Sequence, residues 1–196
     1  MSSFKLPFTP IESRARTHAL LSSIGFLILL PLGVLLARYA RTFTSRWWWA
    51  HGLIQFVVSG PVILAGWAYG YQTTQRLFTG GNWVDTHKKI GLALLVLYLF
   101  QVFFGLFVHF LKFPRFARTP LHRPPQNYLH AILGLAILAL AAYQVHYGLY
   151  TEWPRSTGGL HAVTQEAKHA WLALIIVRLH PPPPHLRVPD DQFLAT

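Results

Sequence analysis

Two stretches of the chain carry the same set of polar and small residues at the same spacing. Each has histidine, glycine, glutamine and glycine at offsets of 0, 4, 14 and 18. These residues are His87, Gly91, Gln101 and Gly105 in the first stretch and His130, Gly134, Gln144 and Gly148 in the second. At about 100° per residue, the four positions fall within roughly 40° of one line along an α-helix. The repeat therefore predicts two helices, each with one stripe of histidine, glycine and glutamine.

Two further apolar stretches also begin with a histidine. His18 opens one of them, and His51 opens the other with Gln55 one turn later. Imidazole is a good ligand for iron and other transition metals. The chain has no cysteine and its one methionine is Met1, which excludes disulfides, iron–sulfur clusters and thioether-attached haem. A buried metal must therefore take histidine or oxygen ligands.

The four histidines each precede an apolar run of about 20 residues, long enough for a helix to cross a hydrocarbon core of about 30 Å. The predicted spans are 18–38, 48–71, 88–111 and 127–150. Of all residues, 53% are hydrophobic and 12% charged. Because lipid offers no partner for backbone polar groups, helices are expected. The fold class is an all-α integral membrane protein, an antiparallel bundle with a four-helix haem-binding core. A fifth helix at 169–180 reaches only about 18 Å.

Four parts are expected along the chain. They are a polar N-terminal tail at 1–17, the four-helix core at 18–150, a loop and short fifth helix at 151–180, and a Pro-rich, disordered tail at 181–196. The first part lacks the apolar core of a signal peptide, so no cleavage is expected. The net charge is +11, but the basic residues lie in short loops, where Lys and Arg set topology and meet anionic lipids. Nucleic acid is not expected as a partner.

Alternate histidines should reach the same membrane face, because successive spans run in opposite directions and each begins with a histidine. His18 and His87 share one face, called face A, and His51 and His130 share the other, face B. Two histidines on non-adjacent helices suit one haem b, held noncovalently between two imidazoles. We therefore predict two bis-histidine haems, with these four histidines as the metal ligands and cofactor-binding residues. No catalytic residue is assigned.

The other histidines and the glutamines have weaker interpretations. His109 lies near face B and is the alternative ligand there, whereas His146 points away from the stripe and suits a loop edge or an access pocket. Gln101 and Gln144 could form hydrogen bonds between helices. Surface positions are expected for His122, His161, His169, His180 and His185.

The histidine-bearing stretches resemble the cytochrome b561 family, particularly the module that is fused to DOMON domains in fungi and other eukaryotes. The matching pieces are "HALLSSIGFLILLPLGVLLARY", "WWWAHGLIQFVVSGPVILAGWAYG", "HKKIGLALLVLYLFQVFFG" and "NYLHAILGLAILALAAYQVHYG". The resemblance implies two haems b with the same histidine pairs. It also implies electron transfer from cytosolic ascorbate to monodehydroascorbate, ferric iron or a partner redox domain.

Two departures from the family pattern affect the expected partners. No DOMON domain precedes the first span, so a fungal-like, stand-alone module is expected, with any redox domain on a separate chain. The family also has a further span after the His130 helix, and here that region breaks at Pro181–Pro184, because prolines do not continue a helix. The last span is therefore expected to be short or truncated.

The loops after the first and third spans are basic and carry no acid, which favours face B as cytosolic. Electrons are expected to enter at face B and leave at face A, between sites about 20 Å apart. Basic residues that could meet haem propionates or an anionic donor are Lys88 and Lys89 at face A and Arg41, Arg46, Lys112, Arg115 and Arg123 at face B. A plasma membrane or endomembrane and a homodimer are compatible with the sequence.

Two alternatives remain open. The chain could be a haem b membrane anchor that exchanges electrons with quinone for a partner enzyme. It could also be a metal-ion carrier or a structural helix bundle that uses its histidines without haem. An ascorbate-dependent or ferric reductase activity is left open by the sequence.

Overall fold

The computed structural model describes residues 6–76, 85–110 and 125–179. These residues form helices and connecting turns, without a β-strand among them. The first long helix comprises α1 (Pro10–Ser23), η1 (Ile24–Leu29) and α2 (Leu30–Ala40), and the second comprises α3 (Trp47–Gly52), η2 (Leu53–Val58) and α4 (Ser59–Arg76). The third is α5 (Thr86–Phe110), and the fourth comprises α6 (Pro125–Tyr147), η3 (Gly148–Glu152) and α7 (Trp153–Ser156). The last helix is α8 (Gln165–Leu179).

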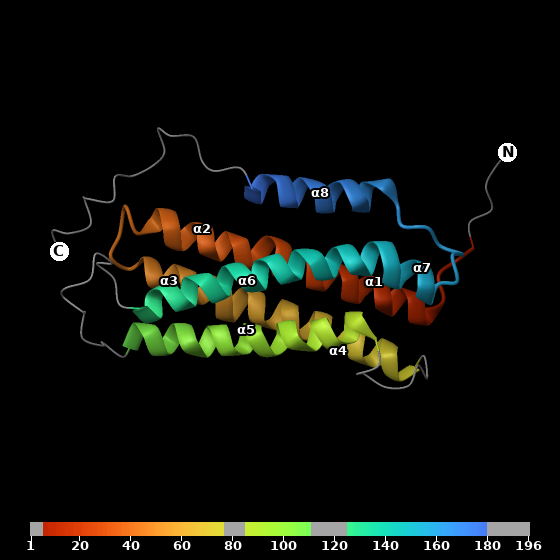
Figure 1. The fold of residues 1–196 in the computed structure, drawn as a ribbon, viewed down its shortest axis with the longest axis horizontal. Helices are drawn as coiled ribbons and strands as arrows, with labels where there is room; N and C mark the ends of the chain where they lie inside the picture. The colour runs from red at the N-terminus through yellow and green to blue at the C-terminus, as the bar shows by residue number, and fades with distance from the viewer. Residues whose placement is uncertain (1–5, 77–84, 111–124, 180–196) are drawn as a thin grey trace.

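Four of these helices are long and apolar enough to cross a membrane, namely Pro10–Ala40, Trp47–Arg76, Thr86–Phe110 and Pro125–Ser156. They run side by side along the long axis of the molecule (Figure 1). The predicted fold class is confirmed, and the chain is a multi-pass integral membrane protein. α8 has 15 residues and covers about 22 Å, which is less than the thickness of the hydrocarbon core.

The first helix begins at Pro10, eight residues before the apolar run that starts at His18. Thr9 caps it: its hydroxyl accepts a hydrogen bond from the Glu12 backbone N–H, and its own N–H donates to the Glu12 carboxylate at 2.7 Å. This reciprocal capping box, with proline at the first helical position, fixes a helix start. Residues 10–17 of the expected polar tail therefore form about two turns of the helix that carries His18.

Two π-helical turns lie just before the prolines inside the first two spans. The Leu30 N–H bonds to the Gly25 carbonyl ahead of Pro31, and the Ser59 N–H bonds to the Ile54 carbonyl ahead of Pro61. Proline has no N–H to give to the preceding turn, and a π turn is one way for a helix to accommodate that loss. Both helices stay continuous, with one wide turn each near mid-span.

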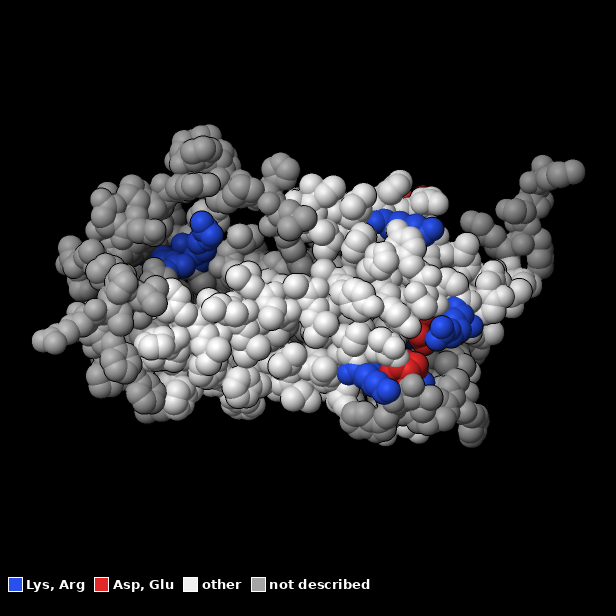
Figure 2. All heavy atoms as spheres, viewed as in Figure 1, with Lys and Arg blue, Asp and Glu red and all other residues white. Residues whose placement is uncertain are grey.

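The four spans pack as two pairs with a narrow core between them. The first helix packs mainly on the second, and α5 packs mainly on α6. Core side chains include Leu27, Ile63, Leu94, Tyr98 and Ile137. Large apolar side chains lie on the outside, as a lipid environment permits, and the charged residues gather toward the two ends on the face shown in Figure 2.

α8 runs along the bundle beside α6 (Figure 1). Its main anchor is Trp171, whose indole N–H donates a hydrogen bond of 3.1 Å to the Ala142 carbonyl of α6. Leu172 and Ile176 on the same helix are about half exposed. α8 is thus attached to the outside of the four-helix bundle and contributes none of the four predicted ligands.

Candidate haem-binding site

The structure brings together the two histidines predicted at face A. His18 on α1 and His87 on α5 have ring centroids 6.0 Å apart, and the ring planes meet at 82°. Both side chains are half-buried. The two histidines, 69 positions apart in the chain (87 − 18), thus meet where α1 and the start of α5 lie together, toward the right-hand end of the bundle in Figure 1.

The two histidines predicted at face B also meet. His51 on α3 and His130 on α6 have ring centroids 6.5 Å apart and ring planes at 80°. This pair lies at the opposite end of the bundle from the face-A pair (Figure 1). The two pairs therefore have nearly the same geometry.

Backbone carbonyls of the neighbouring helix hold the rings of His18 and His51. His18 Nδ1 lies 2.7 Å from the Gly66 carbonyl oxygen, and His51 Nδ1 lies 2.9 Å from the Gly33 carbonyl oxygen. An imidazole that donates from Nδ1 keeps its Nε2 lone pair for a metal. Gly70 makes room for this arrangement, because a Cβ there would lie 2.7 Å from His18 Nδ1.

The repeated stripes of α5 and α6 face each other. A Cβ at Gly148 would lie 3.3 Å from the His87 ring, and a Cβ at Gly105 would lie 2.9 Å from the His130 ring. Gln144 Nε2 donates to the His87 carbonyl, and Gln101 Nε2 donates to the His130 carbonyl, both at 2.6 Å. A Cβ at Gly134 would lie 3.0 Å from Gln101 Nε2, and a Cβ at Gly91 would lie 3.4 Å from Gln144 Nε2. The glutamines therefore bond between helices and tie each histidine to the other helix.

The other histidines that the structure describes lie outside the two pairs. His109, the alternative ligand at face B, is exposed and stacks on Trp48 at 3.7 Å. His146 stacks on Tyr150 at 4.5 Å and leans on Trp171 at 5.0 Å. His169 is exposed on α8, and His122, His180 and His185 lie outside the described residues.

His161 has two oxygen partners at the face-A end. Its Nδ1 lies 2.8 Å from a Glu12 carboxylate oxygen, and its Nε2 lies 3.1 Å from the Leu6 carbonyl. The hydrogen bond to Glu12, followed by the bond to Leu6, raises the pKa of His161 above its usual value. This contact ties the loop after α7 to the start of α1 and was not expected from the sequence.

Two of the basic residues proposed around the haems, Lys88 and Arg41, have local partners. The Lys88 ammonium lies 2.9 Å from Asp85, and the Arg41 guanidinium lies 5.8 Å from the centre of the Trp47 ring. Burial disfavours the charged form of Asp85, but the N–H and ammonium of Lys88 outweigh it and lower the pKa of that carboxyl. Lys112, Arg115 and Arg123 lie outside the described residues. Lys88, the residue directly after His87, is therefore held in place by its ion pair with Asp85.

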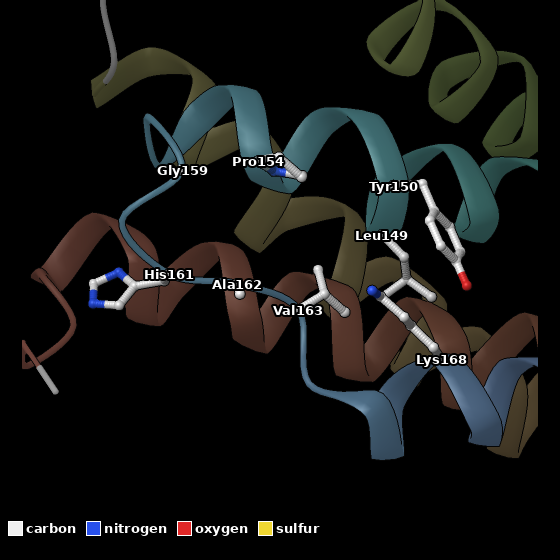
Figure 3. A pocket seen from close by; sticks show the side chains of 8 residues that line it. All are labelled: Leu149, Tyr150, Pro154, Gly159, His161, Ala162, Val163 and Lys168. Carbon is white, nitrogen blue, oxygen red and sulfur yellow. The ribbon is translucent and has the colours of Figure 1, made fainter. Parts of the chain in front are cut away.

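A shallow pocket opens at the face-A end, between the end of the fourth span and the start of α8 (Figure 3). Tyr150 and Lys168 line one side, with the Lys168 ammonium 5.4 Å from the centre of the Tyr150 ring. His161 lies at the other side, with its ring turned away from Tyr150 (Figure 3). None of the four paired histidines lines this pocket.

The histidine pairs fit haem iron. Metal–imidazole nitrogen bonds are about 2.0 Å long, so one metal ion held between two facing imidazoles separates the ring centroids by about 6 Å. The observed separations are 6.0 and 6.5 Å. Among the described residues the metal-ligating side chains converge in twos, without a group of three or more. A haem iron has two axial positions, because the macrocycle fills the other four, so two histidines can occupy both.

Sequence reasoning missed the carbonyls of Gly33 and Gly66 and the close approach of Gly70. Gly70 could have been found, because it stands 19 residues after His51 (70 − 51), close to the 18-residue offset of the repeat. The carbonyls could not, since every residue has one and only the packed helices show which of them meets a ring.

Fold and site together define a multi-pass membrane protein whose helix bundle holds one pair of histidines near each end. The family model described as eukaryotic cytochrome b561 matches residues 17–155. The chain therefore belongs to the cytochrome b561 family. It is a transmembrane cytochrome whose family binds haem b and transfers electrons.

Three relatives are cytochrome b561 and DOMON domain-containing proteins of Arabidopsis thaliana. The first is 36% identical over 92 residues, which is 46% of this chain and 22% of the relative. The others are 36% and 33% identical over 90 and 95 residues, covering 44% and 48% of this chain and 21% and 23% of each relative. The match thus spans about a fifth of the length of these relatives. No solved structure matches the chain.

Proposed function

We propose that this chain holds two haems b, one between His18 and His87 and one between His51 and His130, and carries electrons from one membrane face to the other. The observation that supports this most directly is that the two histidine pairs have similar ring-centroid separations, 6.0 and 6.5 Å, and lie at opposite ends of one bundle. Haem iron with both axial positions filled takes up and releases single electrons.

The protein's own part is to place the ligands and exclude water between them. The Nε2 atoms of His18 and His51 are available to bind iron, because the Nδ1 atoms form hydrogen bonds with carbonyls of the neighbouring helix. Leu27, Ile63, Leu94, Tyr98 and Ile137 fill the bundle between the two ends. About 27 Å of helix separates His87 from Gly105, the residue that contacts His130, since the 18 intervening steps rise about 1.5 Å each. The two sites thus serve opposite membrane faces.

We further propose that a cytosolic reductant such as ascorbate donates electrons at face B. The acceptor at face A would be monodehydroascorbate, ferric iron or a separate redox domain. The names of the Arabidopsis relatives include a DOMON domain, which makes a domain of that kind a suitable partner. Basic residues at each end, such as Lys88 and Arg41, would attract anionic substrates or haem propionates.

Haem content of the purified chain tests the core of this proposal. Two haems b per chain with a reduced low-spin spectrum are expected, and His87→Ala and His51→Ala should each remove one haem. His169→Ala, at an exposed histidine on α8, is the control that should keep both. A folded but colourless protein would contradict the proposal, and so would loss of neither haem in His87→Ala.

The donor is tested separately by mixing the oxidised protein with ascorbate or with a quinol in rapid-mixing experiments. Faster reduction by ascorbate is expected. Reduction by quinol alone would favour the alternative of a quinone-linked haem anchor. Reduction of ferric chelates from the opposite side of sealed vesicles would identify the acceptor side.

A further inference from the structure

The pocket between the end of the fourth span and the start of α8 has a volume of about 270 Å³ (Figure 3). This is room for a group of several heavy atoms, since one water molecule takes up about 30 Å³ of the liquid. Neither histidine pair contributes to the lining, so the proposed haem sites leave the pocket without a role. Its own residues therefore have to show what it binds.

The walls of the pocket are mostly apolar. Leu149, Pro154, Ala162 and Val163 supply aliphatic carbon, and no Asp or Glu among the described residues contributes to the lining. The His161 ring at one side is already held by a carboxylate oxygen 2.8 Å away. The ligand must therefore have an apolar part, and its polar part must be recognised by another side chain.

Lys168 supplies the positive charge of this pocket. Its ammonium lies 5.4 Å from the centre of the Tyr150 ring, and it forms no ion pair within the described part of the chain. Glu166, two positions earlier, lies about 200° away around α8. An aromatic ring stabilises an exposed ammonium by only about 0.5–1 kcal/mol, so Lys168 still attracts an anion.

The pocket lies at the level of the membrane surface. The fourth span ends at Ser156, and Tyr150 and Trp153 stand in its last turns, where aromatic rings mark the lipid headgroup region. Lys168 is in the first turn of α8, three residues after its start at Gln165. Basic side chains at this depth are attracted to anionic lipid headgroups.

α8 continues from Lys168 into the bilayer as an apolar surface. Leu172 and Ile176 follow Lys168 at intervals of four residues, and both are about half exposed. α8 runs along the bundle from its face-A end (Figure 1), so these residues lie deeper than Lys168. From Lys168 to Ile176 the helix rises about 12 Å, which is most of the roughly 15 Å in one half of the hydrocarbon core.

We propose that this pocket binds one phospholipid with an anionic headgroup. The phosphate meets the Lys168 ammonium, the adjoining part of the headgroup fills the space bordered by Tyr150 and Val163, and an acyl chain lies along Leu172 and Ile176. The lipid adds a second attachment of α8 to the bundle besides Trp171. The site is separate from the proposed haem sites and does not depend on them.

Binding of phosphatidylglycerol to the delipidated, full-length chain, followed by native mass spectrometry, tests this site. One lipid per chain should bind more tightly than any others, and phosphatidylcholine should bind there more weakly. Lys168→Gln should weaken the tight site about fivefold, the effect of one basic residue near an anionic lipid surface. Arg76→Gln is the control, because Arg76 is exposed at the end of α4, at the same face and outside the pocket. It should leave the affinity unchanged.

Val163→Trp tests the cavity itself, because it keeps Lys168 and fills space beside it. This variant should also weaken the tight site. Saturating phosphatidylglycerol should raise the unfolding midpoint of the unaltered protein and raise it less in Lys168→Gln and Val163→Trp. Inorganic phosphate, which has the same charged group without an acyl chain, should fail to displace the bound lipid.

Four results would overturn the assignment. Equal affinities for phosphatidylglycerol and phosphatidylcholine would show that the headgroup charge is not recognised. Equal losses in Lys168→Gln and Arg76→Gln would show a general effect of surface charge. Unchanged binding in both pocket variants would place the lipid elsewhere. Displacement of the lipid by inorganic phosphate would assign the pocket to a soluble anion.

Discussion

At the scale of single residues, Gly105 shows how little space surrounds the His130 ring. A Cβ at Gly105 would lie 2.9 Å from His130 Cε1, closer than side chains pack. Gly105→Ala should therefore displace the ring, lower the stability by about 1–3 kcal/mol and reduce haem occupancy at face B. The measurements are the unfolding midpoint in detergent and haem per chain.

Gly52→Ala is the control for this substitution. Gly52 is also helical and lies next to His51, but a Cβ there meets nothing within 4 Å. Alanine is the better helix former, so this variant should gain about 0.5–1 kcal/mol. Equal effects of the two substitutions would contradict the close contact at Gly105.

His161 gives the protein a pH-dependent contact outside the spans. Its pKa is raised by Glu12 and by the Leu6 carbonyl, so the folded state binds the proton more tightly than the unfolded state does. The contact therefore makes its full contribution to the stability of the folded state below the ordinary pKa of about 6.5. This contribution is lost as the pH rises through the higher folded-state pKa. His161→Gln should flatten that part of the stability profile, which lies above the ordinary pKa of about 6.5.

Thermal unfolding in detergent at several pH values measures the effect. His169→Gln, at an exposed position on α8, should keep the slope of the unaltered protein. A slope in His161→Gln that equals that of the unaltered protein would show that the contact with Glu12 does not control it.

At the scale of elements, the π turn before Pro61 is tied to α5. Because the Ser59 N–H bonds to Ile54, the Gln55 carbonyl loses its usual helical donor. The Tyr98 hydroxyl of α5 replaces it at 2.7 Å, and Tyr98 is only 3% exposed. The hydroxyl thus joins the two helix pairs at mid-membrane.

Tyr98→Phe should cost about 1–3 kcal/mol, because it leaves a buried carbonyl without a donor. Tyr143→Phe is the control, since Tyr143 is 50% exposed, and it should change stability by less than about 0.5 kcal/mol. Unfolding midpoints of the two variants in the same detergent decide the matter. A Tyr98→Phe midpoint equal to that of the control would mean that water or another donor serves Gln55.

The elements also show which parts of the fold are visible in a sequence. Length and apolarity predicted four spans, and all four are present, because lipid leaves helices as the main solution. Thr9 followed by Glu12 three residues later is a capping-box pattern that marks the helix start in the sequence, whereas the apolar run alone predicts a start near His18. The π turns were not readable, since a proline predicts a disturbed helix without specifying its form.

The same contrast applies to the site. Helix direction alone predicted that His18 would share a face with His87, and His51 with His130, and the structure places the rings accordingly. Their role as haem ligands stays a prediction. The partners of Gln101 and Gln144 depend on which helices pack together, and the repeat along each helix carries no information about its neighbour.

At the scale of the whole molecule, the two ends of the four-helix bundle lie on opposite sides of the membrane. Phe43, between α2 and α3, is 86% exposed, and Leu160, after α7, is 69% exposed. The chain has no cysteine, so Phe43→Cys and Leu160→Cys each introduce one thiol. With face B cytosolic, an impermeant maleimide should label Leu160→Cys on intact cells and Phe43→Cys only after permeabilisation. Labelling in the reverse order would invert the proposed orientation, and labelling of both from one side would contradict the four-span topology.

The register of α5 against α6 determines the contacts of the facing stripes at both ends of the bundle. Gln144 and Gly148 reach His87 at one end, while Gln101 and Gly105 reach His130 at the other. A slide of α5 along α6 by one turn, about 5.4 Å, would part both histidines from their glutamines together. A displacement of α5 along α6 at one end of the bundle would therefore also change the surroundings of the histidine at the opposite end.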